Sequence, residues 1–283
     1  MKKTDVLICG KGFIGGKLET ALGGRAVTTF IRSFADAERL VRRFRPRVLI
    51  NAIGYTGRRN VDDCERDREG TLTANVFVPL WLAEAAIRHG VKFVHISSGC
   101  IYNYDYEKDR PLEEERVPDY FDLFYSRTKI YAERALLPLC GRYGILIVRL
   151  RIPLDDTPHP KNLLTKLIAY GKVIELANSV TYVPDFIRAV RFLLRRNARG
   201  IYNVVNKGGL RYVDLMEAYR RLRPDFAYER IRFRSLGLKR SNLILSCRKL
   251  EKAGFRVRPI RSVLKECVRE YVRQVRPGGQ GGT

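Results

Sequence analysis

Apolar and polar positions in the first half of the chain alternate between two patterns. Short, almost wholly apolar runs rich in β-branched residues predict strands at 5–9, 26–31, 47–53, 92–96 and 144–150. Between them, apolar residues recur at helical spacing, which predicts helices near 13–22, 34–44, 71–89 and 121–141. Apolar strands joined by crossover helices are typical of a parallel sheet covered on both faces. We therefore expect an α/β, doubly wound sheet.

The rhythm changes after residue 150. Pro153, Pro158 and Pro160 interrupt the chain, and shorter elements follow. Helices are expected near 162–170, 184–196, 212–222 and 261–274, with a strand at 200–205. We divide the chain into a sheet domain over 1–150, a smaller C-terminal α/β lobe over 151–275 and a disordered tail over 276–283. Segments within 178–205 are candidates to return to the sheet.

The composition is that of a globular chain of 283 residues, 45% of them hydrophobic. No apolar run approaches 18 residues and the first residues lead into a strand, so neither a membrane-spanning helix nor a signal peptide is expected. The six cysteines are widely spaced without a CxxC pair, and histidine occurs three times. We therefore expect no metal site and no disulfide framework, and a reduced, cytoplasmic protein.

The formal net charge of +24 has two interpretations. Clustered cations would bind the phosphates of a nucleic acid. Arginines that alternate with apolar residues at helical spacing, as in 186–196, instead indicate the solvent faces of amphipathic helices. The second interpretation is favoured because the basic residues are spread over many segments. Such a surface would still steer an anionic ligand to its site.

A glycine fingerprint follows the first predicted strand. Gly10, Lys11, Gly12, Phe13, Ile14 and Gly15 form G-x-G-x-x-G between a strand and a helix, which predicts a Rossmann-type dinucleotide site. The second predicted strand ends at Arg32 without an acidic residue, and Arg32 with Lys11 favours NADPH, although NADH stays open. Ala52, Gly54 and Tyr55 end the third strand near the expected adenosine ribose, and Asn75 is placed to brace the active-site helix.

Candidate catalytic hydroxyls follow in the same region. Ser98 ends the fourth predicted strand, where open α/β sheets bind their ligands. Tyr125 and Lys129 are four residues apart and share one face of a helix. A tyrosine needs a nearby cation to serve as an acid–base group at neutral pH. The three residues predict reduction of a carbonyl, with Tyr125 and Lys129 also contacting the cofactor.

Cys100 lies two residues beyond Ser98. A free cysteine near a strand end is usually a small buried apolar residue. Beside a hydride-transfer site, however, a thiolate is able to remove a proton next to a ketone, provided that a cation such as Lys129 or Lys166 stabilises it.

These residues together resemble an extended short-chain dehydrogenase/reductase. The likeness is strongest to the bifunctional nucleotide-sugar 3,5-epimerase/4-reductases of rhamnose synthesis, which are related to dTDP-4-dehydrorhamnose reductases. It rests on GKGFIGG at 10–16, NAIGYTGRRNVDDCE at 51–65, SGCIYNYD at 98–105, FYSRTK at 124–129, RLRIP at 149–153, PKNLLTK at 160–166 and RSN at 240–242. The glycine loop departs from plant relatives, which have threonine before the central glycine and then tryptophan.

The resemblance implies roles for single residues. Ser98, Tyr125 and Lys129 fall on the reductase triad, and Cys100 and Lys166 on the epimerase acid–base pair. Arg58, Asn60, Asn162, Arg240 and Asn242 are candidate contacts of the sugar or diphosphate. GDP-fucose synthases are similar but pair the cysteine with a histidine, so Lys166 favours the rhamnose branch.

The implied substrate is a UDP- or dTDP-linked 4-keto-6-deoxyglucose, and the implied product is the NDP-L-rhamnose. Three alternatives stay open: a reductase without epimerase activity, a GDP-fucose synthase-like enzyme, and a non-catalytic NADP-binding subunit. We expect no membrane partner. The oligomeric state, including a homodimer, stays open.

Overall fold

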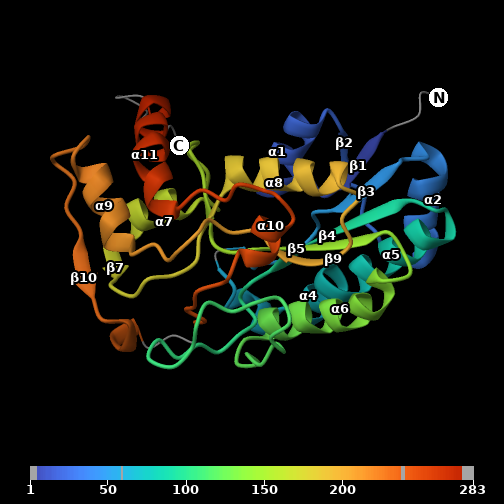
Figure 1. The fold of residues 1–283 in the computed structure, drawn as a ribbon, viewed down its shortest axis with the longest axis horizontal. Helices are drawn as coiled ribbons and strands as arrows, with labels where there is room; N and C mark the ends of the chain where they lie inside the picture. Colours follow the sequence, from blue (N-terminus) through green and yellow to red (C-terminus); the bar gives the residue numbers. More distant parts are fainter. Residues whose placement is uncertain (1–4, 59, 237–239, 276–283) are drawn as a thin grey trace.

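The computed structural model describes residues 5–58, 60–236 and 240–275. Its centre is a parallel sheet of six strands in the order β2-β1-β3-β4-β5-β9 (Figure 1). The strands are β1 (Val6–Cys9), β2 (Arg25–Val27), β3 (Val48–Asn51), β4 (Lys92–Ser98), β5 (Ile145–Leu150) and β9 (Gly200–Asn203). The predicted α/β class with a doubly wound parallel sheet is confirmed. The strand order reverses between β1 and β3, which is the switch point where such sheets bind ligands.

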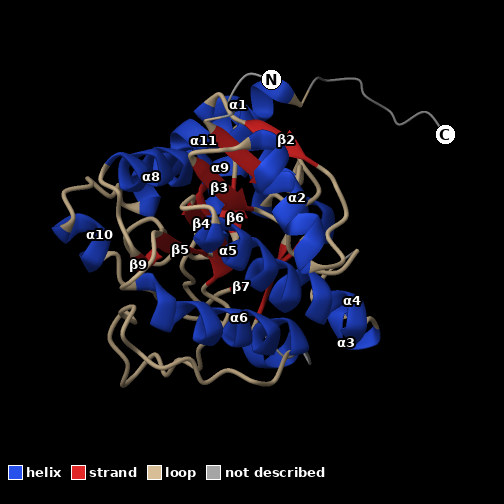
Figure 2. Cartoon of the chain, turned by 90° about the vertical axis from the view of Figure 1, so that its right-hand side faces the viewer, coloured by secondary structure: helices blue, strands red, loops and turns tan. Residues whose placement is uncertain are grey.

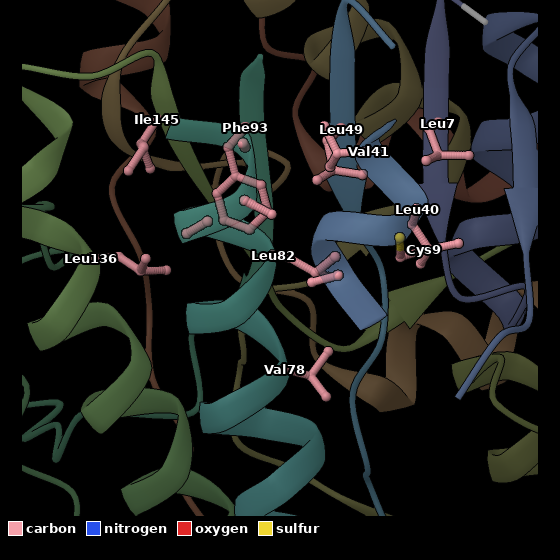
Figure 3. Close-up of a cluster of buried hydrophobic side chains, with 14 of the residues drawn as sticks. Leu7, Cys9, Leu40, Val41, Leu49, Val78, Leu82, Phe93, Leu136 and Ile145 are labelled. Carbon is pink, nitrogen blue, oxygen red and sulfur yellow. The ribbon is translucent and has the colours of Figure 1, made fainter. Parts of the chain in front are cut away.

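Helices cover both faces of the sheet, because successive strand residues point to opposite faces. One face carries α2 (Phe34–Phe44), α5 (Val78–Arg88) and α6 (Phe124–Cys140). There Leu7, Leu49 and Phe93 of the strands pack against Leu82 and Leu136 of the helices (Figure 3). The opposite face carries α1 (Phe13–Leu22), α8 (Val183–Arg195) and α10 (Arg248–Lys252), and its core includes Ile8, Ile50, Val94, Leu18 and Phe186. Figure 2 shows the strands between these two helical layers.

The edge strand β2 is shorter than the predicted 26–31. Its last residue, Val27, pairs with Cys9, which is also the last residue of β1. Because β1 is the only neighbour of β2 among the described residues, no strand in that part of the chain pairs with it beyond Val27. Residues 28–31 therefore leave the sheet, and they line a cavity described below.

The region predicted as one helix at 71–89 contains a local irregularity. Short helices α3 (Asp63–Arg66) and α4 (Arg68–Leu72) precede a π-helical turn, η1 (Thr73–Phe77), which continues into α5. Arg68–Arg88 is long and apolar enough by composition to cross a membrane, but half of its most apolar window is buried inside the fold. Core helices of soluble proteins have this character, so the segment is weak evidence for a membrane span.

A lobe packs beside the carboxyl ends of the strands (Figure 1, left). It contains β6 (Pro153–Leu154) paired with β8 (Thr181–Tyr182), and β7 (Lys172–Ile174) paired with β10 (Glu229–Ile231). Its helices are α7 (Leu163–Tyr170), α9 (Tyr212–Arg220), α11 (Ile260–Gln274) and the 3₁₀ turn η2 (Phe233–Leu236). Leu164, Met216 and Leu264 belong to its own apolar core. The tail predicted at 276–283 lies outside the described residues.

Candidate active site

The glycine loop joins β1 to α1. Gly10 has a φ of +100°, and a Cβ there would lie 2.9 Å from the backbone of Ala52 and Ile53. A Cβ on Gly15 would lie 2.0 Å from the carbonyl oxygen of Gly10, whereas Gly12 faces open space. The first turn of α1 has no side-chain cap. The loop therefore leaves backbone N–H groups and a helix N-terminus open to an anionic group such as a pyrophosphate.

A cavity of about 560 Å³ lies beside this loop. Its lining includes Gly10, residues 27–31, Ile53 and Tyr55, so its position at the switch point suits an adenosine group. Arg32 directly follows this lining and is exposed. The ammonium group of Lys11 is paired with Glu19 at 3.1 Å. Asp67 and Glu69 also line the cavity, two acidic residues that sequence reasoning did not single out.

Ser98, Tyr125 and Lys129 come together at the carboxyl end of β4. The Ser98 hydroxyl forms a hydrogen bond with the Tyr125 phenol, while burial raises the pKa of that phenol. The ammonium nitrogen of Lys129 lies 6.0 Å from the centre of the Tyr125 ring. Burial lowers the pKa of Lys129 to about 8, although Glu133 and Cys100 act in the opposite direction. A Cβ on Gly54 would lie 3.3 Å from the Lys129 nitrogen, so glycine keeps this approach clear.

Asn75, within the π-helical turn η1, braces this group from behind. Its side-chain oxygen accepts the N–H of Tyr55 at 2.9 Å, and its nitrogen donates to the carbonyl oxygen of Tyr55 at 3.0 Å. The same nitrogen donates to the hydroxyl of Thr128 at 3.1 Å, and that hydroxyl donates to the carbonyl oxygen of Tyr125 at 2.8 Å. Such π-helical turns are frequent at functional sites. Asn75 thereby fixes α6 against the loop after β3.

Cys100 is half-buried next to the triad. Its backbone N–H donates to the Ser98 hydroxyl at 3.2 Å, and its carbonyl oxygen accepts the Ser126 hydroxyl at 2.5 Å. The guanidinium of Arg151 donates to the Cys100 sulfur. Sequence reasoning considered Lys129 and Lys166 as the cation beside this thiol and did not consider Arg151.

Lys166 lies in a cluster of basic residues on the lobe side of the site. Burial lowers the pKa of Lys166, and the nearby charges of Lys161 and Arg240 lower it further. The ammonium group of Lys161 donates to the Thr56 hydroxyl and the Gly57 carbonyl oxygen, each at 3.0 Å. Arg240 makes two 2.7 Å bonds to the Asp62 carboxylate. This cluster, in which Lys161 was not anticipated, suits an anionic group such as a diphosphate.

The phenol of Tyr120 lies within electrostatic range of both the basic cluster and the thiol. Burial and then Asp122 raise its pKa to about 12, and its other electrostatic neighbours are Arg240, Cys100 and Arg151. Within the described residues no hydrogen bond joins Lys166 to Cys100.

The remaining predicted substrate contacts differ in their availability. Arg58 is exposed, and the side-chain oxygen of Asn60 accepts the N–H of Asp62 at 2.9 Å. Asn162 is fully buried, and its amide bonds the backbone of Asp155, Thr157 and Leu164 as the cap of α7. Asn242 is held by Tyr106, Ala177 and Asn178. Asn162 and Asn242 therefore have structural partners, and their contact with a substrate stays a prediction.

The lobe also contacts the glycine loop and the start of α1. Phe13 stacks on His159 with ring centres 4.2 Å apart, and the ammonium group of Lys17 pairs with the Asp155 carboxylate at 2.6 Å. Sequence reasoning missed these contacts, because Lys17 and Asp155 are far apart along the chain and nothing local pairs them.

The parallel sheet, the glycine loop and the Ser98–Tyr125–Lys129 group define a dinucleotide-dependent reductase fold of the short-chain dehydrogenase/reductase class. The family model described as "RmlD substrate binding domain" matches residues 6–273, and the chain belongs to this family.

Curated relatives agree with this assignment. An Arabidopsis thaliana bifunctional dTDP-4-dehydrorhamnose 3,5-epimerase/dTDP-4-dehydrorhamnose reductase is 32% identical over 239 residues, which cover 80% of this chain and 78% of that protein. A trifunctional UDP-glucose 4,6-dehydratase/3,5-epimerase/reductase from the same plant is 30% identical over 234 residues. That match covers 78% of this chain and 35% of the trifunctional protein.

Solved structures share the fold. The L780 UDP-rhamnose synthase of Acanthamoeba polyphaga mimivirus superposes with a TM-score of 0.85 at 23% identity, covering 95% of this chain and all of that one. A dTDP-4-dehydrorhamnose reductase from Bacillus anthracis, in complex with NADP, has a TM-score of 0.80 at 20% identity, covering 97% of this chain and all of that one.

Proposed function

We propose that this chain reduces the C4 ketone of a nucleotide-linked 4-keto-6-deoxyglucose with NADPH and also epimerises C3 and C5, giving the NDP-L-rhamnose. The observation that carries the proposal is the convergence of Ser98, Tyr125, Lys129 and Cys100 at the carboxyl end of β4. The names of the relatives support both activities, since the Arabidopsis protein similar to this chain is called an epimerase/reductase. The NADP complex of the Bacillus anthracis reductase supports the cofactor.

In the reduction, Tyr125 donates the proton to the ketone oxygen. Burial keeps the phenol protonated at neutral pH, so it is competent as a donor. Ser98 holds the same oxygen, and the Lys129 ammonium stabilises the phenolate that forms. NADPH, when bound, supplies the hydride. The exposed Arg32 beside the cavity is the side chain that would meet its 2′-phosphate.

In the epimerisation, the Cys100 thiolate removes a proton at C3 or C5. Both C–H bonds are acidic because the C4 ketone accepts the electron pair as an enolate. Ser98 and Tyr125 hydrogen-bond the enolate oxygen. Lys166 returns a proton to the opposite face, and its lowered pKa makes it a better donor than an exposed lysine.

The test is to identify the product by NMR after incubating the enzyme with NADPH and UDP- or dTDP-4-keto-6-deoxyglucose. We expect the L-rhamno product. Cys100→Ala should abolish turnover of this substrate while it retains reduction of the pre-epimerised ketosugar. Equal loss with both substrates, or no loss with either, would remove Cys100 from the epimerisation.

A reductase that accepts only the pre-epimerised ketosugar is the second candidate. It is favoured by one observation: the charged groups that act on Lys166 are Lys161 and Arg240 rather than Cys100. In that case the wild-type protein should consume NADPH only with the pre-epimerised ketosugar.

A further inference from the structure

Arg151 is a buried cation that the roles described above leave unexplained. It directly follows β5 and is 1% exposed. Its guanidinium donates to the Asn178 side-chain oxygen at 3.2 Å and to the hydroxyl and carbonyl oxygens of Ser241 at 3.2 and 2.5 Å. Its remaining side-chain hydrogen bond is to the Cys100 sulfur.

Arg149, two residues earlier, shows what a buried arginine normally requires. It is also 1% exposed, and its guanidinium pairs with the Glu133 carboxylate at 2.5 Å. Burying a charge without a counter-charge costs several kcal/mol, which is why buried arginines are paired. Among the described residues, no carboxylate lies within ion-pair distance of Arg151. Its only partner able to become an anion is the thiol of Cys100.

We propose that Arg151 holds Cys100 as a thiolate, so that the two residues form a buried ion pair. An arginine stays protonated in proteins, so Arg151 is a permanent positive charge and does not compete with Lys166 as a proton donor. Nearby cations are the usual means by which proteins keep a cysteine ionised at neutral pH. Arg151 acts on the reactive sulfur and not on the sugar.

Other groups that face this thiol do not supply the same charge at direct contact. Tyr125 on α6, Tyr120 before it and Tyr212 on α9 are neutral phenols, because burial raises the pKa of each. Lys129 is a second cation nearby, but burial lowers its pKa to about 8. Arg151 is the cation whose hydrogen bond reaches the sulfur.

The inference rests on the proposed epimerisation for its consequence. The thiolate accepts the proton as the sugar C–H bond breaks, and the electron pair of that bond moves to the enolate oxygen. Lys166 protonates the opposite face and then regains a proton from solvent, while the new S–H group loses its proton to solvent. Arg151 gains and loses nothing, and it restores the thiolate after each turn.

The thiolate can be measured without any substrate. Five of the six cysteines are buried, and all six lie in the described ranges, so Cys100 should be the cysteine that iodoacetamide modifies in the folded protein. The rate of its carbamidomethylation, followed by peptide mass spectrometry from pH 5.5 to 9, reports the thiolate fraction. We expect Arg151→Gln to slow labelling at pH 6.5 by about ten-fold or more, the effect of one unit in the titration midpoint.

Two further variants separate charge from shape. Arg151→Lys keeps the positive charge and should restore part of the rate at pH 6.5. Ser241→Ala removes a neutral partner of the same guanidinium nitrogen and should leave the rate within about two-fold of the wild type. If Arg151→Gln does not fold, the wild-type profile decides: labelling that rises only around pH 8.5, as for a free thiol, contradicts the proposal.

The labelling experiment tests the ion pair separately from the proposed epimerisation. If Arg151→Gln slows the labelling of Cys100 but the wild-type protein exchanges no deuterium at C3 or C5 of the ketosugar, the ion pair is supported and the epimerase activity is rejected. Exchange that persists in Arg151→Gln with unchanged labelling would reject the ion pair and keep the epimerase.

Discussion

The two groups of residues that we propose carry out reduction and epimerisation, called here the reducing and the epimerising half of the site, are built from different parts of the molecule. Ser98, Tyr125 and Lys129 lie on β4 and α6, two adjacent elements of the sheet layers, and Asn75 fixes them from behind. Cys100 instead meets Arg151, which follows β5 and whose guanidinium also donates to Ser241. Lys166 belongs to α7 of the lobe.

This difference concerns geometry as well as origin. The reducing group needs only the sheet, η1 and α6 to be complete, whereas the epimerising group requires the lobe to dock correctly. We infer that disturbances of the lobe weaken epimerisation first. Single substitutions in each half test that separation.

The largest effect is expected for Tyr125→Phe. The ketone oxygen would lose its proton donor, so NADPH oxidation with the pre-epimerised ketosugar, followed at 340 nm, should slow by about 10²–10⁴-fold. Deuterium exchange at C3 and C5 in D₂O should fall less, because Cys100 remains. Tyr131→Phe, on the exposed face of the same helix, is the matched control. A Tyr125→Phe enzyme that reduces the ketosugar at the normal rate would contradict the division of the site into two halves.

Lys129→Met should slow reduction, by less than Tyr125→Phe does, and yet stabilise the protein. The folded-state pKa of about 8 lies below the ordinary 10.5, so the unfolded chain binds the proton more tightly. Wild-type stability therefore rises between about pH 8 and 10.5, and below pH 8 the buried charge costs up to about 3 kcal/mol. Urea unfolding at pH 7 should show the variant more stable than the wild type by up to that amount, with the gap closing near pH 10.

The exposed Lys265→Met should change the unfolding free energy by no more than about 0.5 kcal/mol. A Lys129→Met protein that is less stable than the wild type at pH 7 would mean that the ammonium contributes to the fold.

Sequence reasoning brought Ser98, Tyr125 and Lys129 to one place, as the structure does, because the signals are local. The apolar run ending at Ser98 marks a strand end, and the spacing of Tyr125 and Lys129 places both on one helical face whatever the rest of the chain does. The fold class followed from the same local patterns. The end of β2 was misplaced because an apolar run does not reveal where its only partner strand stops.

Local sequence patterns predicted only part of the epimerising half. Cys100 and Arg151 are 51 positions apart, and Arg240 meets Asp62 across 178 positions. These pairs depend on how the lobe docks on the sheet, which no local periodicity encodes. Asn162 appeared as a polar residue in a motif, but its amide is used to cap α7 and to hold the Asp155 backbone. One signal was available for Arg151: an arginine within an otherwise apolar strand end requires a partner.

The smallest effect, and the sharpest for the comparison, is expected for Asn75→Ala. The change removes three hydrogen bonds and leaves the Tyr55 N–H without its side-chain acceptor, which should cost about 1–3 kcal/mol in unfolding free energy. Because Thr128 then positions Tyr125 less firmly, reduction should slow by about ten-fold. Iodoacetamide labelling of Cys100 should keep its pH profile, since Asn75 contacts neither Cys100 nor Arg151. Asn103→Ala, an exposed loop asparagine, serves as control. A changed labelling profile would show that Asn75 positions both halves of the site.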